Sequence, residues 1–126
     1  VQETAKAIVK QKMSTIGLLG TKFTMEQSFF KEKLSAYGIT TLIPEAEERE
    51  FIHSSIFTEL GKGIFTKEIK IKYLRIIENL RKKGAEGIVF GCTEIPLLIQ
   101  QEDCNIQTFD TTLIHATAAV NYALGN

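Results

Sequence analysis

The segment GIVFGCTEIPLL, residues 87–98, runs from an apolar strand directly into the start of a helix. Its first four residues, 87–90, are apolar without alternation, which is typical of a parallel strand covered on both faces. Thr93 can cap the following helix, Glu94 suits the positive end of its dipole, and Pro96 is tolerated in a first helical turn. A strand that passes straight into a helix indicates a βα unit and hence a parallel sheet.

Further apolar runs alternate with amphipathic stretches along the whole chain. Together with the first run they predict four strands, at residues 16–19, 39–43, 87–90 and 106–109. Helices are predicted at residues 2–12, 24–37, 48–60, 67–83 and 111–124. Thr40 and Thr41 place the second strand at a sheet edge, and Thr24 with Gln27 forms a capping-box pattern. This order predicts a flavodoxin-like α/β layer, with a roughly four-stranded parallel sheet and helices on both faces.

The composition of the 126 residues limits the possible classes of function. Apolar residues make up 44% and charged residues 24%, which is typical of a globular fold. Fifteen basic residues balance fifteen acidic ones, so the basic excess that favours nucleic acid or anionic membranes is missing. No apolar run reaches the ~20 residues of a membrane span. The two cysteines fit neither a disulfide framework nor a metal-ligand spacing. We therefore expect a cytoplasmic protein without nucleic-acid, membrane or metal partners.

Three loops are expected at the carboxyl ends of the strands, where open parallel sheets bind their ligands. They are residues 20–24, 91–94 and 110–112. The second contains Cys92, at the predicted start of a helix. Unpaired backbone N–H groups there favour a thiolate and lower the pKa of a cysteine. The residues alone leave two roles for Cys92 equally open: a reactive thiol, or a small buried side chain that closes the turn.

The sequence Gly-Cys-Thr-Glu-Ile-Pro-Leu-Leu at 91–98 resembles the C-terminal signature of the aspartate/glutamate racemases, a family of cofactor-independent amino-acid racemases. The glutamate after Thr93 is similar to the aspartate racemase branch, because glutamate racemases carry histidine there. The resemblance extends to residues 20–24, 59–63 and 109–116, and so covers nearly the whole chain. It implies one of two pseudosymmetric α/β domains, and no cofactor.

The resemblance also implies a mechanism, the racemisation of aspartate or glutamate by two cysteines on opposite faces of the α-carbon. Cys92 matches the C-terminal cysteine of that pair, whereas the N-terminal one has no counterpart in this sequence. Cys104 does not replace it, because we expect residues 101–105 to form a loop at the other end of the sheet. The chain would supply one catalytic cysteine and part of the substrate site, and we expect no appreciable racemase activity from it alone.

Four more residues are assigned to the site through the same resemblance. Lys62, between two glycines, matches the lysine that binds the side-chain carboxylate of the substrate; without the resemblance it would be an ordinary solvated lysine. Thr21 and Thr93 would contact the substrate, and Thr93 would also cap the helix. Glu94 is expected to support the site rather than to act as a base.

Both ends of the chain predict that it works as part of a larger protein. The sequence opens at Val1 within a helical pattern, so we expect the C-terminal portion of a two-domain racemase, with residues 1–110 as the α/β domain and 111–126 as a terminal helix. That helix carries no charge and is apolar on more than one face. We expect one side to pack on the sheet and another on the missing N-terminal domain or on a second subunit of a homodimer. The alternative function is a non-catalytic α/β module that binds a small carboxylate.

Overall fold

The structure, a computed structural model, describes residues 1–125 and contains a four-stranded sheet in the order β2-β1-β3-β4. All three strand pairs are parallel. The strands are β1 (Thr15–Leu19), β2 (Thr40–Leu42), β3 (Gly87–Phe90) and β4 (Gln107–Asp110). This strand order confirms the flavodoxin-like α/β prediction and the edge position of β2.

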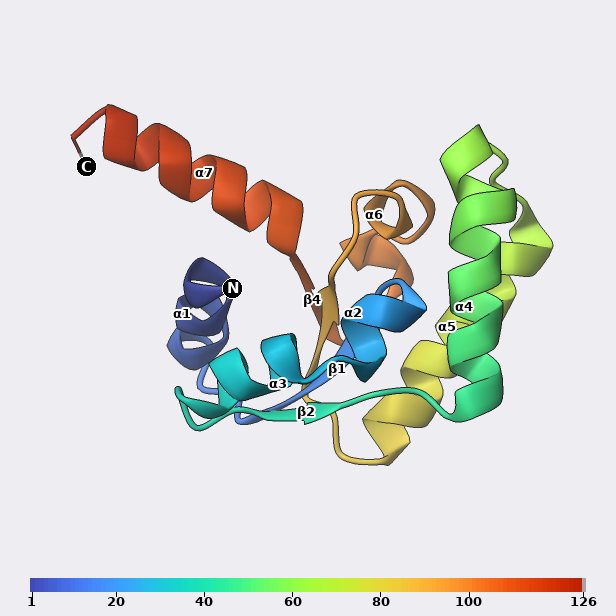
Figure 1. Cartoon of the computed structure of the whole chain (residues 1–126), viewed down its shortest axis with the longest axis horizontal. Coiled ribbons are helices and arrows are strands. Elements are labelled where there is room, and N and C mark those ends of the chain that lie inside the picture. Colours follow the sequence, from blue (N-terminus) through green and yellow to red (C-terminus); the bar gives the residue numbers. More distant parts are fainter. Residues whose placement is uncertain (126) are drawn as a thin grey trace.

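Helices cover both faces of the sheet (Figure 1). One face carries α4 (Ala46–Thr58), α5 (Lys67–Lys82) and α6 (Ile95–Leu98), and the other carries α1 (Gln2–Lys10) and α3 (Ser28–Ser35). The remaining helices are α2 (Lys22–Glu26), α7 (Thr111–Ala123) and two 3-10 turns, η1 (Leu60–Lys62) and η2 (Gln101–Asp103).

Each face of the sheet has its own apolar cluster. Every residue of β3 is buried, with Ile88 and Phe90 in the cluster under α4 and α5, and Val89 in the cluster under α1 and α3. This confirms the prediction of a strand covered on both faces. The apolar stripe of α5 is also buried in full and consists of Ile69, Tyr73, Ile76, Ile77 and Leu80.

The helix start predicted at Thr24 is wrong. The hydroxyl of Thr21 accepts a hydrogen bond from the backbone N–H of Thr24 at 3.3 Å and caps α2. The chain then leaves the helical conformation at Gln27, where φ is −74° and ψ is 148°, before α3 begins. The capping-box pattern fails because Thr21, three residues earlier, offers the same kind of acceptor where β1 ends.

The terminal helix α7 leaves the sheet instead of folding back onto it (Figure 1). The Asp110 carboxylate caps it, accepting hydrogen bonds from the N–H groups of Thr112 at 3.0 Å and Leu113 at 3.2 Å. No residue of α7 is buried, and Ile114 is the one side chain of the helix that packs against an apolar cluster. The expected packing of a whole helix side on the sheet is therefore wrong, because α7 continues beyond the end of β4 and lies against α1.

Candidate functional site

The loops that follow β1 and β3 lie side by side at the carboxyl edge of the sheet. The Gly91 N–H donates to the carbonyl of Leu19 at 2.7 Å. The Thr24 side chain packs across both loops, since a Cβ atom at Gly91 would lie 3.0 Å from Thr24 Cγ2, and one at Gly20 would lie 3.2 Å from it. The absence of a side chain at each glycine therefore lets α2 settle onto the two loops.

The loop after β4 joins the same edge. The Thr111 hydroxyl donates to the carbonyl of Phe90, the last residue of β3, at 2.9 Å. Phe90 is also the register partner of Asp110. The structure thus brings together the three loops in which the sequence predicts a ligand site.

Cys92 is half-buried directly after β3, against the cluster that contains α4 and α5. Burial raises the pKa of its thiol, and the Glu94 carboxylate beside it raises that pKa further. Hydrogen bonds from the backbone N–H groups of Ile95 and Glu94 lower this pKa, but by less than burial and the Glu94 carboxylate raise it. The predicted lowering of the Cys92 pKa is therefore wrong. Helix α6 has only four residues and a correspondingly weak dipole, whereas desolvation and a neighbouring anion both disfavour the thiolate.

A buried pair of hydroxyls lies close enough to Cys92 to interact with it electrostatically, and the sequence did not reveal it. The Tyr73 hydroxyl and Ser55 Oγ are 2.6 Å apart, and Ser55 donates to the carbonyl of Ile52 at 2.9 Å. Burial raises the pKa of Tyr73, and the hydrogen bond with Ser55 offsets only part of that increase. Glu59, and Cys92 when it is ionised, raise this pKa further. Tyr73 thus stays a neutral phenol. A serine aligned with the apolar side of α4 was the one sequence signal for this pair.

Thr93 does not cap the helix that follows it. The N-cap of α6 is Glu94, which makes no side-chain cap bond, and Pro96 lies in the first turn as predicted. The hydroxyl of Thr93 is exposed and forms no hydrogen bond with any other residue in the range 1–125. The predicted cap fails because α6 begins one residue later than expected, which leaves this hydroxyl available to a ligand.

Lys62 lies in η1, directly after α4, and is exposed. Gly63, which follows it, has a φ of 78° and ends the turn in the left-handed region. Leu60 packs into the apolar cluster that Cys92 also contacts, so η1 lies on the same side of the sheet as the cysteine. Within residues 1–125 the Lys62 ammonium has no carboxylate partner.

His53 has a structural role that the sequence did not suggest. Its Nδ1 accepts a hydrogen bond from the backbone N–H of Lys22, the first residue of α2, at 2.9 Å. The ammonium of Lys22 also forms an ion pair with Glu50 of α4 at 3.0 Å. Helix α4 therefore holds the start of α2, and with it Thr21, at the carboxyl edge.

Cys104 lies in the turn before β4, at the opposite end of the sheet from Cys92, as predicted. Burial and Asp103 raise the pKa of its thiol. No group of three His, Cys, Asp or Glu side chains in the described part of the chain could hold a metal ion. Across residues 1–125, no helix has the length and apolar character needed to cross a membrane.

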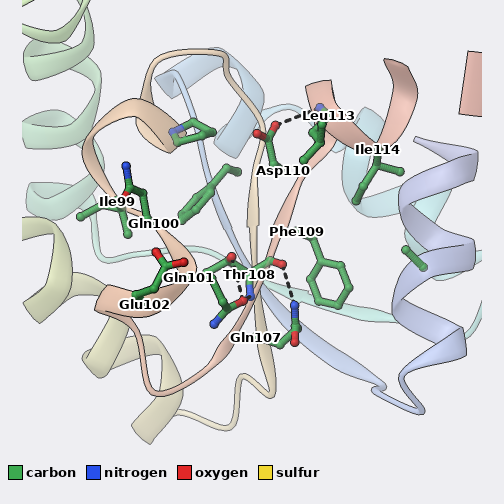
Figure 2. A pocket seen from close by; sticks show the side chains of 13 residues that line it. Ile99, Gln100, Gln101, Glu102, Gln107, Thr108, Phe109, Asp110, Leu113 and Ile114 are labelled. Atoms are coloured by element: carbon green, nitrogen blue, oxygen red, sulfur yellow. Dashed lines mark hydrogen bonds between the residues drawn. The ribbon is translucent and has the colours of Figure 1, made fainter. Parts of the chain in front are cut away.

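Two hollows lie on the β4 side of the sheet and beside α7. One of about 560 Å³ runs along β4 (Figure 2), and another of about 660 Å³ lies between α1 and α7. Neither is lined by Cys92, Lys62, Thr21, Thr93 or Glu94. The candidate residues therefore lie outside both hollows, and Thr93 and Lys62 are exposed.

The chain is similar in sequence to known proteins. Residues 1–119 match the Asp/Glu/Hydantoin racemase family, which confirms the resemblance seen in the motif around Cys92. An uncharacterized protein in the pnlA 3′ region of Pectobacterium carotovorum subsp. carotovorum is 26% identical over 102 residues, which are 81% of this chain and 67% of that protein.

Solved structures give the same result at higher coverage. A Yersinia pestis protein assigned as an Asp/Glu racemase superposes with a TM-score of 0.93 at 44% identity, covering 98% of this chain and 54% of that one. An aspartate racemase homologue from Pyrococcus horikoshii OT3 gives 0.91 at 36% identity, with 97% and 54% covered. The Picrophilus torridus aspartate racemase gives 0.71 at 25% identity, with 98% and 50% covered. This chain spans about half the length of each of these three structures.

Proposed function

The chain belongs to the Asp/Glu/hydantoin racemase family, and we propose that it is one of two α/β halves of a cofactor-independent amino-acid racemase acting on aspartate or glutamate. The observation that carries the proposal is the position of Cys92, at the carboxyl edge of the sheet and next to the loop that follows β1. The half-length coverage of the matched structures supports a second half, and the Picrophilus torridus aspartate racemase supports the substrate class. With two cysteines and no disulfide framework, the protein suits the cytoplasm.

Cys92 would carry one of the two proton transfers that racemisation needs. The reaction removes the α-proton from one face of the carbon and delivers a proton to the other, so an acid and a base must flank it. Burial and Glu94 raise the pKa of Cys92, so the resting residue is a thiol and starts as the proton donor. The thiolate left behind is a stronger base than an ordinary cysteine, which suits it to the reverse direction. The opposing base would come from the second half.

The substrate would be held by groups around Cys92 that are still free to bond. The exposed hydroxyl of Thr93 and the ammonium of Lys62 are available to carboxylates of the substrate. The Thr21 hydroxyl accepts a hydrogen bond from the Thr24 N–H and lies 3.2 Å from the Thr24 hydroxyl. When the Thr24 hydroxyl is the donor of that pair, the Thr21 proton can be donated to the substrate. Fixed donors beside the α-carboxylate would stabilise the carbanion formed when the proton leaves. Glu94 would act through Cys92, by raising the basicity of the sulfur.

Exchange of the substrate α-proton with solvent deuterium tests the proposal. The natural-length protein is incubated in D2O with D- and L-forms of aspartate, glutamate and several neutral amino acids, and loss of the α-proton signal is followed by NMR. We expect exchange with inversion for an acidic substrate, and its loss in a Cys92→Ser variant. A Cys104→Ser variant serves as the matched control and should keep its activity.

The separate 126-residue chain provides the second arm of the experiment. We expect it to give no appreciable exchange, because one proton-transfer group in an open site is poorly positioned and fully hydrated. Binding of an acidic amino acid by the natural-length protein, without exchange at any substrate, would instead favour the non-catalytic carboxylate-binding module. Full activity in the Cys92→Ser variant would overturn the proposal.

A further inference from the structure

Strand β4 is the outer strand of the sheet on the side away from β2, so its outward peptide groups have no neighbouring strand. The side chain of Gln101, from η2, lies against this edge (Figure 2). Its Nε2 donates to the carbonyl of Ile106 at 2.9 Å. Its Oε1 accepts from the N–H of Thr108 at 2.8 Å and from the Thr108 hydroxyl at 3.0 Å. One side-chain amide thus makes two backbone bonds to the edge.

These two bonds have the pattern of a parallel ladder. In such a ladder, the N–H of a residue donates to the carbonyl of the residue that precedes its partner. The carbonyl of the same residue accepts from the N–H of the residue that follows its partner. The Gln101 amide does both around Gln107, bonding to Ile106 on one side and Thr108 on the other. It therefore takes the place of one residue of an absent fifth strand.

The turn that presents Gln101 is anchored to the body of the protein. The Asp103 carboxylate accepts from the Gln100 N–H at 2.9 Å and pairs with Lys70 of α5 at 2.9 Å. The carbonyl of Thr108 on this edge is also hydrogen-bonded, because Gln107 Nε2 donates to it at 3.1 Å. The covering amides are therefore held in place by defined contacts.

We propose that Gln101 closes the edge of β4 against strand pairing, and that this edge is a latent interface for the β4 strand of a second copy of the chain. Protein edges are commonly protected by lysines or prolines, and β4, with the sequence Gln-Thr-Phe-Asp, has neither. Its one charged side chain, Asp110, is engaged in capping α7. The chain has a formal net charge of zero, so two copies do not repel one another strongly.

The hollow beside β4 gives an incoming strand room and an apolar surface. It measures about 560 Å³ and is lined by Phe109, Leu113 and Ile114 among others. A strand that pairs with itself antiparallel across a twofold axis buries the same groups on both copies. The second copy is thus the partner that this edge fits once Gln101 is removed.

Amide hydrogen exchange measured by NMR tests the closed edge directly. In the unmodified chain we expect the Thr108 amide to be protected, although no strand pairs with it. In a Gln101→Ala variant its exchange should become about tenfold faster, as expected from the loss of one hydrogen bond. Asn105→Ala removes another exposed amide from the same connection and should leave Thr108 unchanged. An unprotected Thr108 amide in the unmodified chain would refute the proposal.

Sedimentation velocity tests the latent interface, with all variants carrying Tyr122→Lys to suppress contacts through α7. We expect concentration-dependent dimers for Gln101→Ala and monomers for Asn105→Ala. Gln101→Glu keeps an acceptor for the Thr108 N–H and adds a charge to the edge, so it should stay monomeric. If Gln101→Ala is folded by circular dichroism yet monomeric, or if Gln101→Glu associates equally, the edge is not the interface. The result does not depend on racemase activity.

Discussion

At Cys92, two opposing influences act on one sulfur atom, and the structure shows which prevails. Two backbone N–H groups stabilise the thiolate, but desolvation and the Glu94 carboxylate destabilise it more, so the pKa is raised. A buried thiol next to an anion is a reluctant acid and a strong base. In the proposed reaction, that combination suits a group that first donates its proton and removes one from carbon in the reverse direction.

We predict that Glu94→Gln lowers the pKa of Cys92, because the change removes the neighbouring charge and keeps both backbone N–H groups. The pKa should fall only part of the way, since burial is the larger cause of the shift. Each unit of decrease raises the thiolate fraction at neutral pH about tenfold. Alkylation by iodoacetamide, followed by mass spectrometry from pH 6 to pH 10, measures the change.

Cys104 is the internal control for this experiment. Its raised pKa comes from burial and Asp103 and owes nothing to Glu94. Its alkylation profile should therefore be identical in the two proteins. An unmoved profile for Cys92, or an equal shift at both cysteines, would contradict the assignment.

The position of Cys92 could be predicted from the sequence, but its acidity could not. Placement follows from an uninterrupted apolar run, because a buried strand ends where the polar residues begin. The pKa depends on the length of α6 and on the apolar cluster behind the sulfur, which comes from residues far along the chain. The hydrogen bond between the Lys22 N–H and His53 could not be predicted for the same reason, because the two residues are 31 positions apart in the sequence.

Among the elements, α2 packs on the loops after β1 and β3 and is held in turn by α4. Its Thr24 methyl group packs on the backbone of Gly91, where an added Cβ would be only 3.0 Å away. We predict that Gly91→Ala destabilises the fold by about 1–3 kcal/mol through this overpacking. Thr24→Ser removes the methyl group and keeps the hydroxyl, so it should recover part of that loss in the double variant.

Urea unfolding of the four proteins in this cycle gives the coupling between the two positions. A favourable coupling is expected because the two residues are in direct contact. Additive effects would mean that the alanine clashes elsewhere, for example with the carbonyl of Leu19, which lies 3.4 Å from the same Cβ position.

The start of β1 is held by one carboxylate from the turn before β3. Glu86 accepts from the N–H groups of Ser14 and Thr15, both at 3.0 Å, and from the Ser14 hydroxyl at 3.2 Å. These bonds lower the pKa of Glu86 below its ordinary value of 4.5. The stabilisation is present above the unfolded-state pKa and is lost as the pH falls through the lower folded-state pKa.

We therefore predict that Glu86→Gln flattens the acid dependence of stability between about pH 5 and pH 3. Glutamine still accepts hydrogen bonds, but it does so independently of pH. Urea midpoints measured from pH 7 to pH 3 give the slope. Glu32→Gln is the control, because Glu32 is exposed and makes no side-chain bond within residues 1–125. Equal slopes for the unmodified protein and Glu86→Gln would contradict the assignment.

For the whole molecule, the alternation of strands and helices was sufficient to predict the sheet, its edge strand β2 and the covering of both faces. The path of α7 could not be predicted in this way. Its composition indicates burial on several sides, yet the sequence does not specify the surface that provides it. Local patterns determine which elements form, whereas the direction of a terminal helix depends on what it packs against.

Helix α7 exposes apolar side chains along its length without any charged residue. Leu113 is 63% exposed, Val120 56% and Tyr122 87%. Soluble monomers seldom leave such a surface uncovered. The half-length coverage of the matched structures is consistent with a second domain that would cover it, and a second subunit of a homodimer is the other candidate.

We predict that the 126-residue chain by itself self-associates through α7 between micromolar and millimolar concentration, because burying this apolar surface between copies removes it from water. Light scattering across that range measures the average mass. Tyr122→Lys and Val120→Lys place a charge on the exposed helix and should shift the chain toward monomer. Ile71→Lys is the matched control, since Ile71 is an exposed apolar residue of α5, 41% accessible and outside α7. It should not change the average mass. A monomer at every concentration, or equal effects of all three substitutions, would show that α7 is not the contact surface.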